Sequence, residues 1–272
     1  ATGGAPNHGK AIPGIEHVIS SNEAFHLPEL PKRILIQGGG YIALEFACIF
    51  SGLGSLVTVV YRGDNILRGF DDDVRAHVRD EMEKNGITIL TGCTVDGIEK
   101  HDDWYTSHLS NGSSIASDKV MFAIGRHPAV ANLGLERAGV AINPDNGGVA
   151  VNEASQSSVP HIYAVGDVTH RFNLTPVAIR EGHAFADTVF GKRAVKVDHI
   201  DIPTAVFTQP QVGTVGLTEA QARDAHGDAV VAYEYNLAGN GKSEILGTGG
   251  IAKVVRTEGG PILGVHLVGD RV

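Results

Sequence analysis

Short apolar runs and stretches with helical spacing alternate through the first third of the chain. Arg33–Ile36 is an apolar run of the kind found in buried parallel strands. Tyr41–Ser51 follows with apolar residues at helical spacing, and Leu56–Val60 is the next apolar run. Asp71–Asn85 is charged and amphipathic, and Ile87–Leu90 returns as a third strand. This order predicts a βαβαβ unit with parallel strands.

The pattern then changes to short alternating runs. Thr94–Glu99, Trp104–Leu109 and Lys119–Ile124 are separated by turns such as Asn111-Gly112, so we expect a small antiparallel excursion and a return strand. A loop-rich stretch follows and leads to one further strand and one further helix, at Ile162–Val165 and Val177–Phe190.

After Asp201 the alternation has the two-residue period of strands. The runs suggest a separate sheet-containing region, and they are Thr204–Phe207, Ala229–Tyr235, Gly250–Arg256 and Gly264–Val268. At the other end, Ala1–Gly9 has the pattern of the end of a strand running into a Gly/Pro turn, and Ala1 is not Met. We therefore expect further sequence upstream.

Composition and charge narrow the function classes. The chain has 272 residues, of which 42% are hydrophobic, and its net charge is 22 − 31 = −9, so we expect a folded protein and no nucleic-acid partner. Cys48 and Cys93 form no C-x-x-C pair and are interpreted as small buried side chains, and no metal site is predicted. The least charged stretch, Ile34–Tyr61, is a poor membrane span because glycines and Glu45 interrupt it. We expect a cytoplasmic protein with no membrane partner.

The strongest local signal is Gly38-x-Gly40-x-x-Ala43, placed between a strand and a helix. The first glycine allows a tight turn, the second lets the backbone approach a pyrophosphate, and the small Ala43 permits close packing of helix on strand. A lone glycine pattern is weak evidence, and its bland alternative is a packing turn. Between two strands at this distance, it predicts a dinucleotide site.

The end of the second strand indicates which nucleotide binds. An NAD site would place an Asp or Glu about 20 residues beyond the glycines, where it would accept hydrogen bonds from the ribose 2′-hydroxyl. Here that position is Tyr61, followed by Arg62 and Arg68. Two guanidinium groups suit a 2′-phosphate, so we predict NADPH. The alternative is a pair of solvated surface arginines.

Five motifs in order resemble one family. They are Gly38-Gly-Gly-Tyr-Ile-Ala-Leu-Glu45, Tyr61-Arg-Gly-Asp-Asn-Ile-Leu-Arg-Gly-Phe-Asp71, Ala123-Ile-Gly-Arg126, Ile162-Tyr-Ala-Val-Gly-Asp167 and Leu174-Thr-Pro-Val-Ala-Ile179. Together they resemble the FAD-dependent pyridine nucleotide disulfide oxidoreductases, most closely the glutathione reductase branch. The resemblance implies an α/β fold in which a Rossmann-type NADP-binding domain with a parallel sheet is inserted in part of an FAD-binding domain, before the start of an α+β interface domain. The implied segments are 1–29 and 129–199 for FAD, 30–128 for NADP, and 200–272 for dimerisation.

The resemblance also implies roles for particular residues. Tyr41 would cover the flavin until nicotinamide displaces it, and Glu45 would sit beside the flavin edge; these two are the predicted catalytic residues. Asp167 would hydrogen-bond the flavin ribityl chain, and Thr175 would lie near the pyrimidine side of the isoalloxazine ring. The predicted cofactor-binding set is Gly38, Gly40, Tyr41, Ile42, Ala43, Glu45, Arg62, Arg68, Gly125, Arg126, Gly166, Asp167, Leu174 and Thr175. Without its neighbouring motifs, Gly166-Asp167 would be interpreted as an ordinary Asx turn.

The chain also departs from the family's pattern. The first FAD-binding unit, the Cys-x4-Cys redox pair and the terminal His-Pro segment are not in this sequence, so the 272 residues resemble the middle of a longer homodimeric enzyme. Leu237–Ser243 and Gly264–Arg271 are more similar to lipoamide dehydrogenases. We expect an NADPH-dependent flavoprotein that reduces a small disulfide, glutathione disulfide first. The alternatives are a lipoamide dehydrogenase-like enzyme that works with NAD, and a non-catalytic NADPH-binding module.

Overall fold

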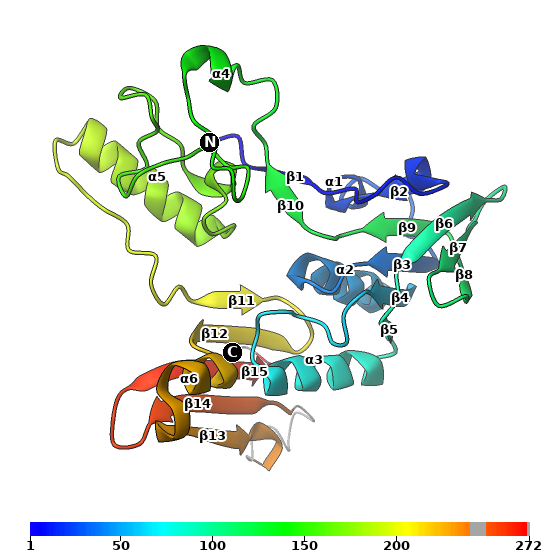
Figure 1. Cartoon of the computed structure of the whole chain (residues 1–272). Helices are drawn as coiled ribbons and strands as arrows, with labels where there is room; N and C mark the ends of the chain where they lie inside the picture. Colours follow the sequence, from blue (N-terminus) through cyan, green and yellow to red (C-terminus); the bar gives the residue numbers. More distant parts are fainter. Residues whose placement is uncertain (240–248, 271–272) are drawn as a thin grey trace. The chain divides into compact units, whose positions relative to one another are not determined.

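The computed structural model describes residues 1–239 and 249–270. The chain forms two compact units, whose elements are labelled in Figure 1. Unit 1 comprises residues 1–7 and 125–200, and unit 2 comprises residues 8–124 and 201–272.

A five-stranded parallel sheet is the centre of unit 2. Its strand order is β2-β9-β3-β4-β5, and every neighbouring pair is parallel. The strands are β2 (Val18–Ile19), β9 (Lys119–Phe122), β3 (Arg33–Gln37), β4 (Leu56–Tyr61) and β5 (Thr88–Thr91). Helix α2 (Tyr41–Gly52) connects β3 to β4, and helix α3 (Asp72–Lys84) connects β4 to β5. This confirms the predicted βαβαβ arrangement and its parallel sheet.

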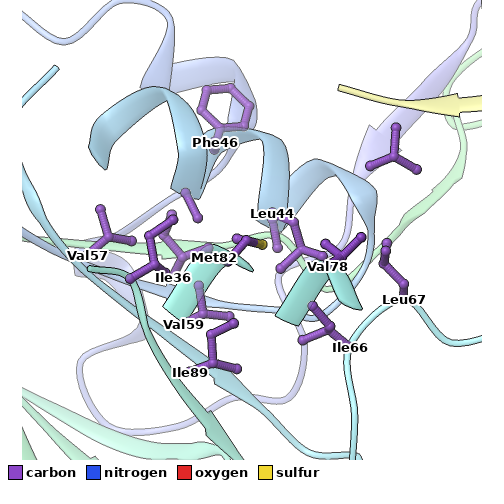
Figure 2. Close-up of a cluster of buried hydrophobic side chains, with 14 of the residues drawn as sticks. Ile36, Leu44, Phe46, Val57, Val59, Ile66, Leu67, Val78, Met82 and Ile89 are labelled. Carbon is purple, nitrogen blue, oxygen red and sulfur yellow. The ribbon is translucent and has the colours of Figure 1, made fainter. Parts of the chain in front are cut away.

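Both faces of this sheet are covered, because successive strand residues point to opposite sides. Ile34 and Ile36 of β3 join a core cluster with the apolar stripes of α2 and α3, whereas Leu35 joins a second cluster. Figure 2 shows members of the first cluster, in which Leu44 of α2 lies toward Val78 and Met82 of α3, while Phe46 points to the other side of α2.

The second cluster lies between the parallel sheet and a small antiparallel one. That sheet has the order β6-β7-β8, and its strands are β6 (Val95–Lys100), β7 (Tyr105–Leu109) and β8 (Ser114–Ser117). Gly112, between β7 and β8, has a φ of +86°, which suits the glycine of the predicted Asn-Gly turn. The predicted antiparallel excursion is confirmed. The short segments η1 (Ile15–His17) and α1 (Ser21–Ala24) precede β3.

The C-terminal part of unit 2 is a five-stranded antiparallel sheet with the order β11-β12-β15-β14-β13. Its strands are β11 (Thr204–Val206), β12 (Gln211–Gly216), β13 (Val230–Asn236), β14 (Ile251–Thr257) and β15 (Ile262–Gly269). The sequence did not predict β12 or helix α6 (Glu219–His226), which buries only Ala222 and so carries almost no apolar stripe. Two single turns, η3 (Gly227–Ala229) and η4 (Leu237–Gly239), flank β13.

The buried side chains of this antiparallel sheet and those of the parallel sheet with α2 and α3 form one core within unit 2. Val206, Val212, Ile251 and Val268 belong to the same buried cluster as the residues beneath α2 and α3. The sheet is distinct, as predicted, but its packing is joined to that of the parallel sheet within unit 2.

Unit 1 contains little regular structure. Strand β1 (Gly4–Pro6) pairs with β10 (Arg126–Pro128), and the helices are α4 (Leu135–Ala138), the single turn η2 (Gly166–Thr169) and α5 (Thr175–Val189). The predicted strand at Ile162–Val165 is wrong, because within the described residues that segment makes only an isolated bridge, between Gln156 and Tyr163. With no neighbouring strand to pair along its length, the apolar run stays irregular.

The state of the two cysteines and the length of the helices can be compared with the sequence-based predictions. Cys48 on α2 and Cys93 after β5 are both free; Cys93 is buried and Cys48 is half-buried. Among the described residues, no helix has both the length and the apolar character needed to cross a bilayer.

Candidate functional site

The glycine turn after β3 is built around Gly38. Its φ is +148°, and a Cβ added there would lie 2.3 Å from the carbonyl oxygen of Ala123 and 3.1 Å from the Cβ of Ala43. Its N–H donates to the carbonyl of Val60 at 2.9 Å. Gly38 and Ala43 therefore let β3, β9 and α2 meet closely, as the motif predicts.

Gly40 differs, because the space around it is open. It is the N-cap residue of α2, no side chain caps this helix end, and an added Cβ would meet nothing within 4 Å. The first backbone N–H groups of a helix have no partners inside the helix, and the helix dipole favours negative charge there. An uncapped helix of 12 residues with an open glycine at its start suits a phosphate group.

Tyr61 ends β4 where an NAD site would carry an acidic residue. A Cβ on Gly39 would lie 2.5 Å from its ring, and one on Gly63 would lie 2.6 Å from it, so the ring covers both glycines. Arg62 and Arg68 follow in the next loop, and both are exposed. Within the described part of the chain, neither guanidinium makes a hydrogen bond or an ion pair, which leaves both groups available to an anion.

The first turns of α2 carry the two predicted catalytic residues. Tyr41 and Glu45 are four residues apart, so they lie on one face of the helix, and both are half-buried with Ile42 beside them. Glu45 Oε1 accepts a hydrogen bond from the backbone N–H of Phe207 at 2.8 Å. Burial raises the pKa of the Glu45 carboxyl, although the Phe207 N–H opposes this. The sequence offered no signal for the Phe207 contact, which joins segments 162 residues apart.

In unit 1, Gly125 and Arg126 stand at the start of β10. Gly125 is exposed with a φ of +117°, and the Arg126 guanidinium donates to the carbonyl of Gly4 on β1. A Cβ on Gly4 would lie 3.5 Å from both the Cβ and Oδ2 of Asp167. The structure therefore brings Arg126 and Asp167 to the same strand, around a glycine that the sequence analysis did not single out.

The Gly166-Asp167 turn is hydrogen-bonded to the buried carboxylate of Glu181. Gly166 has a φ of +73°, and its N–H donates to Glu181 Oε2 at 2.7 Å. Glu181 is 1% exposed, and its Oε1 also forms an ion pair with Arg171 Nη2 and a hydrogen bond with His199 Nε2, each at 2.8 Å. Glu181 was not among the site residues predicted from the sequence. A signal was present, since the buried face of α5 consists of Val177, Glu181 and Ala184 at helical spacing.

Leu174 and Thr175 begin helix α5. Leu174 is its N-cap residue and Thr175 its first residue, and no side chain caps this end. Thr175 is exposed and Leu174 is half-buried. Helix α5 contacts η2, so both residues belong to the same part of unit 1 as Asp167.

The predicted site residues thus form two groups. Unit 2 holds the glycine turn, Tyr41, Ile42, Glu45 and the two arginines, and unit 1 holds Gly125, Arg126, Gly166, Asp167, Leu174 and Thr175. The segment Leu237–Ser243, predicted to be similar to lipoamide dehydrogenases, lies outside the described residues from 240 onward, as does residue 271 of the second such segment.

Comparisons with known protein families match nearly the whole chain. Residues 1–182 match the family described as pyridine nucleotide-disulphide oxidoreductase, and residues 202–272 match the dimerisation domain of the same family.

Individual relatives agree with this family. A glutathione reductase of Burkholderia cepacia is 45% identical over 264 residues, covering 95% of this chain and 58% of that protein. A trypanothione reductase of Trypanosoma congolense is 43% identical over 282 residues, covering 99% of this chain and 56% of that protein. Among solved structures, the HOCl-induced flavoprotein disulfide reductase RclA from Escherichia coli has a TM-score of 0.91 at 29% identity, covering 100% of this chain and 63% of that one. The chain therefore spans less than two thirds of the length of these relatives.

Proposed function

Because the chain belongs to the pyridine nucleotide-disulphide oxidoreductase family, we propose that it is the central part of an NADPH-dependent FAD flavoprotein that reduces a small disulfide. The observation that carries the choice of NADPH is the loop after β4, where Arg62 and Arg68 are exposed and no acidic residue ends the strand. A 2′-phosphate offers these guanidinium groups several charged acceptor oxygens.

The residues present fit a dinucleotide in unit 2. Gly40 leaves the N-terminus of α2 open, so the pyrophosphate would bind there, against the first backbone N–H groups of the helix. Arg62 and Arg68 would hold the 2′-phosphate. Gly38 and Ala43 would act indirectly, by bringing the helix close to the sheet.

The residues of unit 1 fit a flavin. Gly4 lacks a side chain where it approaches Asp167, whose carboxylate stays partly exposed and could accept hydrogen bonds from ribityl hydroxyls. Gly125 and Arg126 would line the nicotinamide nucleotide, and Leu174 and Thr175 would lie near the isoalloxazine ring. When bound, the flavin would supply hydride acceptance from the nicotinamide and electron transfer to a disulfide.

Tyr41 and Glu45 would shape the nicotinamide side of the reaction. Tyr41 would cover the flavin and exclude water until the nicotinamide displaces its ring. Glu45, held by the Phe207 N–H and half-buried, would orient groups at the flavin edge. Its raised pKa brings its protonation closer to neutral pH than that of a surface glutamate.

The redox cysteine pair would come from outside these residues. Cys48 and Cys93 pack in two different core clusters of unit 2, on opposite faces of the parallel sheet. They therefore cannot form a redox disulfide with one another. The match to the family's dimerisation domain supports a homodimer. We also propose a cytoplasmic location, and the segment boundaries 1–29, 30–128, 129–199 and 200–272 for the two FAD segments, the NADP domain and the interface domain in chain order.

Glutathione disulfide is our first choice of substrate. Relatives named glutathione reductase, at 45% identity, support it, while a relative named trypanothione reductase stands close behind at 43%. NADPH consumption by the whole protein that contains this chain and the redox cysteine pair, supplied with FAD, would be compared for glutathione disulfide, trypanothione disulfide and lipoamide. The 272 residues alone should reduce none of the three. Consumption with glutathione disulfide alone supports the proposal, and consumption with lipoamide and NADH supports the lipoamide dehydrogenase-like alternative.

Nucleotide choice is tested by binding. We expect the purified protein to bind NADPH at least about tenfold more tightly than NADH, since each charge-assisted hydrogen bond to the 2′-phosphate adds affinity. The double variant Arg62→Ala, Arg68→Ala should lose this preference and keep its affinity for NADH. Equal affinity of the unaltered protein for the two nucleotides would contradict the proposal. NADPH binding by a protein that retains no flavin would favour the non-catalytic binding module.

A further inference from the structure

The loop that carries Arg62 and Arg68 has no regular secondary structure, yet its middle is held firmly. Residues 62–70 connect β4 to α3 through bends and turns. The side chains of Ile66 and Leu67 are 0% and 1% exposed, and both belong to the core cluster shown in Figure 2. Leu67 has a φ of +52°, and its N–H donates to the carbonyl of Gly39 at 2.7 Å. The loop is thereby tied to the glycine turn.

One side chain holds the backbone between the two arginines. Arg75, in the first turn of α3, donates from Nε to the carbonyl of Ile66 at 2.8 Å and from Nη2 to the carbonyl of Asn65 at 3.0 Å. Its Nη1 donates to Asp72 Oδ1 at 2.5 Å, and its side chain is only 16% exposed. The planar guanidinium group can form this fork with little further loss of freedom, and a lysine could not reproduce it.

The position of Arg75 is unfavourable for a cation by itself. A positive charge in the first helical turn opposes the helix dipole. Asp72 on the same turn offsets this in part. An arginine at this position is therefore explained better by the two loop carbonyls than by the stability of the helix.

We infer that Arg75 is a positioning residue for a 2′-phosphate site formed by Arg62 and Arg68. This inference rests on the proposed NADPH function. Asn65 and Ile66 lie between the two arginines, three residues after Arg62 and two before Arg68. By fixing both carbonyls, Arg75 sets where each guanidinium leaves the backbone, so that less freedom is lost when an anion binds.

The test uses two ligands that differ only in the 2′-phosphate, namely 2′,5′-ADP and 5′-AMP, with affinities measured by calorimetry at one ionic strength. The purified protein should bind 2′,5′-ADP at least about tenfold more tightly, because charge-assisted hydrogen bonds reward the extra phosphate. Arg75→Met should lose most of that preference, while its affinity for 5′-AMP stays within about twofold, since the pyrophosphate side of the site is untouched. Arg75→Lys keeps the positive charge but not the forked pair of hydrogen bonds, so this variant should retain only part of the preference for 2′,5′-ADP.

Arg79 on the same helix provides the matched control. It pairs with Glu83 at 3.3 Å and reaches the loop only through a 3.5 Å contact with the carbonyl of Asp64. Arg79→Met removes the same charge and should keep the preference. Equal losses in Arg79→Met and Arg75→Met would show a general charge effect and overturn the inference.

The outcomes separate the inference from the proposed function. A folded Arg75→Met protein that keeps its preference overturns the positioning role alone. If Arg75→Met does not fold, full preference in Arg75→Lys overturns it as well. A protein without any preference in its unaltered form overturns both the NADPH site and the role of Arg75.

Discussion

The ion-pair cluster around Lys253 supports a prediction about stability. Lys253 Nζ lies 2.9 Å from Asp71 Oδ1 and 2.8 Å from Glu219 Oε2, and it also pairs with Asp73. The side chains of Lys253 and Asp71 are 4% and 2% exposed. The cluster joins strand β14 to the start of α3 and to α6, all within unit 2. Lys253→Met would keep the apolar stem and remove the charge, which leaves three carboxylates facing one another.

The size of the effect follows from what each carboxylate retains. Asp71 still accepts the backbone N–H of Asp73 at 3.2 Å and that of Glu219 at 2.9 Å, and Glu219 keeps its ion pair with Arg223. Asp73 is half-exposed and can be rehydrated. Removing one partner of a buried pair costs about 3–5 kcal/mol, so we expect the lower end, about 3 kcal/mol. For a chain of this size that lowers the melting temperature by about 6–12 °C.

Urea denaturation followed by far-UV circular dichroism measures this loss. Lys196→Met is the control, because Lys196 pairs with Glu153 on the surface, with both side chains more than 70% exposed. That variant should unfold at the same urea concentration as the unaltered protein. A Lys253→Met protein as stable as the unaltered one would refute the reasoning, since it would mean that the buried carboxylates do not need the ammonium group.

The cluster also predicts a pH dependence. Burial alone would raise the pKa of Asp71, but the Glu219 N–H and Lys253 together hold it below its ordinary value. The hydrogen bond with Lys253 lowers the pKa of Glu219. Burial alone would lower the pKa of Lys253, but its hydrogen bonds to Asp73, Glu219 and Asp71 raise it.

The carboxylates therefore contribute stability above their ordinary pKa of about 4, and this contribution is lost as pH falls through the lowered pKa values. The ammonium contribution persists up to its ordinary pKa of about 10.4 and beyond. The stability gap between the two proteins should be constant near neutral pH and narrow below about pH 4, and a gap unchanged at pH 3 would contradict this.

Two further predictions concern the proposed cofactor sites. Gly38→Ala should lower the melting temperature strongly, because its Cβ would lie 2.3 Å from the Ala123 carbonyl oxygen. Gly40→Val should fold normally and weaken NADPH binding, because the space around Gly40 is open. Equal melting temperatures for the two variants would contradict this assignment. Glu181→Ala removes the acceptor of the Gly166 N–H and leaves a buried donor, at a cost of about 1–3 kcal/mol. It should release flavin more readily than the surface variant Glu153→Ala, as measured by flavin fluorescence after gel filtration, and equal retention would count against a role for this contact.

Much of the architecture followed from local pattern. The β3–α2–β4–α3–β5 order could be predicted because buried parallel strands have continuous apolar runs and the intervening helices have stripes with a 3.6-residue period. The glycine turn was equally accessible, since a φ of +148° at Gly38 demands a residue without a side chain. Strand β12 and helix α6 were not found, because a strand rich in glycine and a helix that buries only Ala222 carry weak periodic signals.

The sequence by itself therefore determined the dinucleotide motif, the replacement of an acidic residue by Tyr61 and two arginines, and the order of the elements. Tertiary structure alone decided which side chains support the site. Lys253 forms an ion pair with Asp71, 182 positions away, and the Phe207 N–H donates to Glu45, 162 positions away. The guanidinium of Arg75 donates to backbone carbonyls of the loop before α3, a contact that the helical spacing of α3 does not predict. Local pattern reports the period of burial along one element, whereas a contact between elements depends on how their faces pack, and no single segment encodes that.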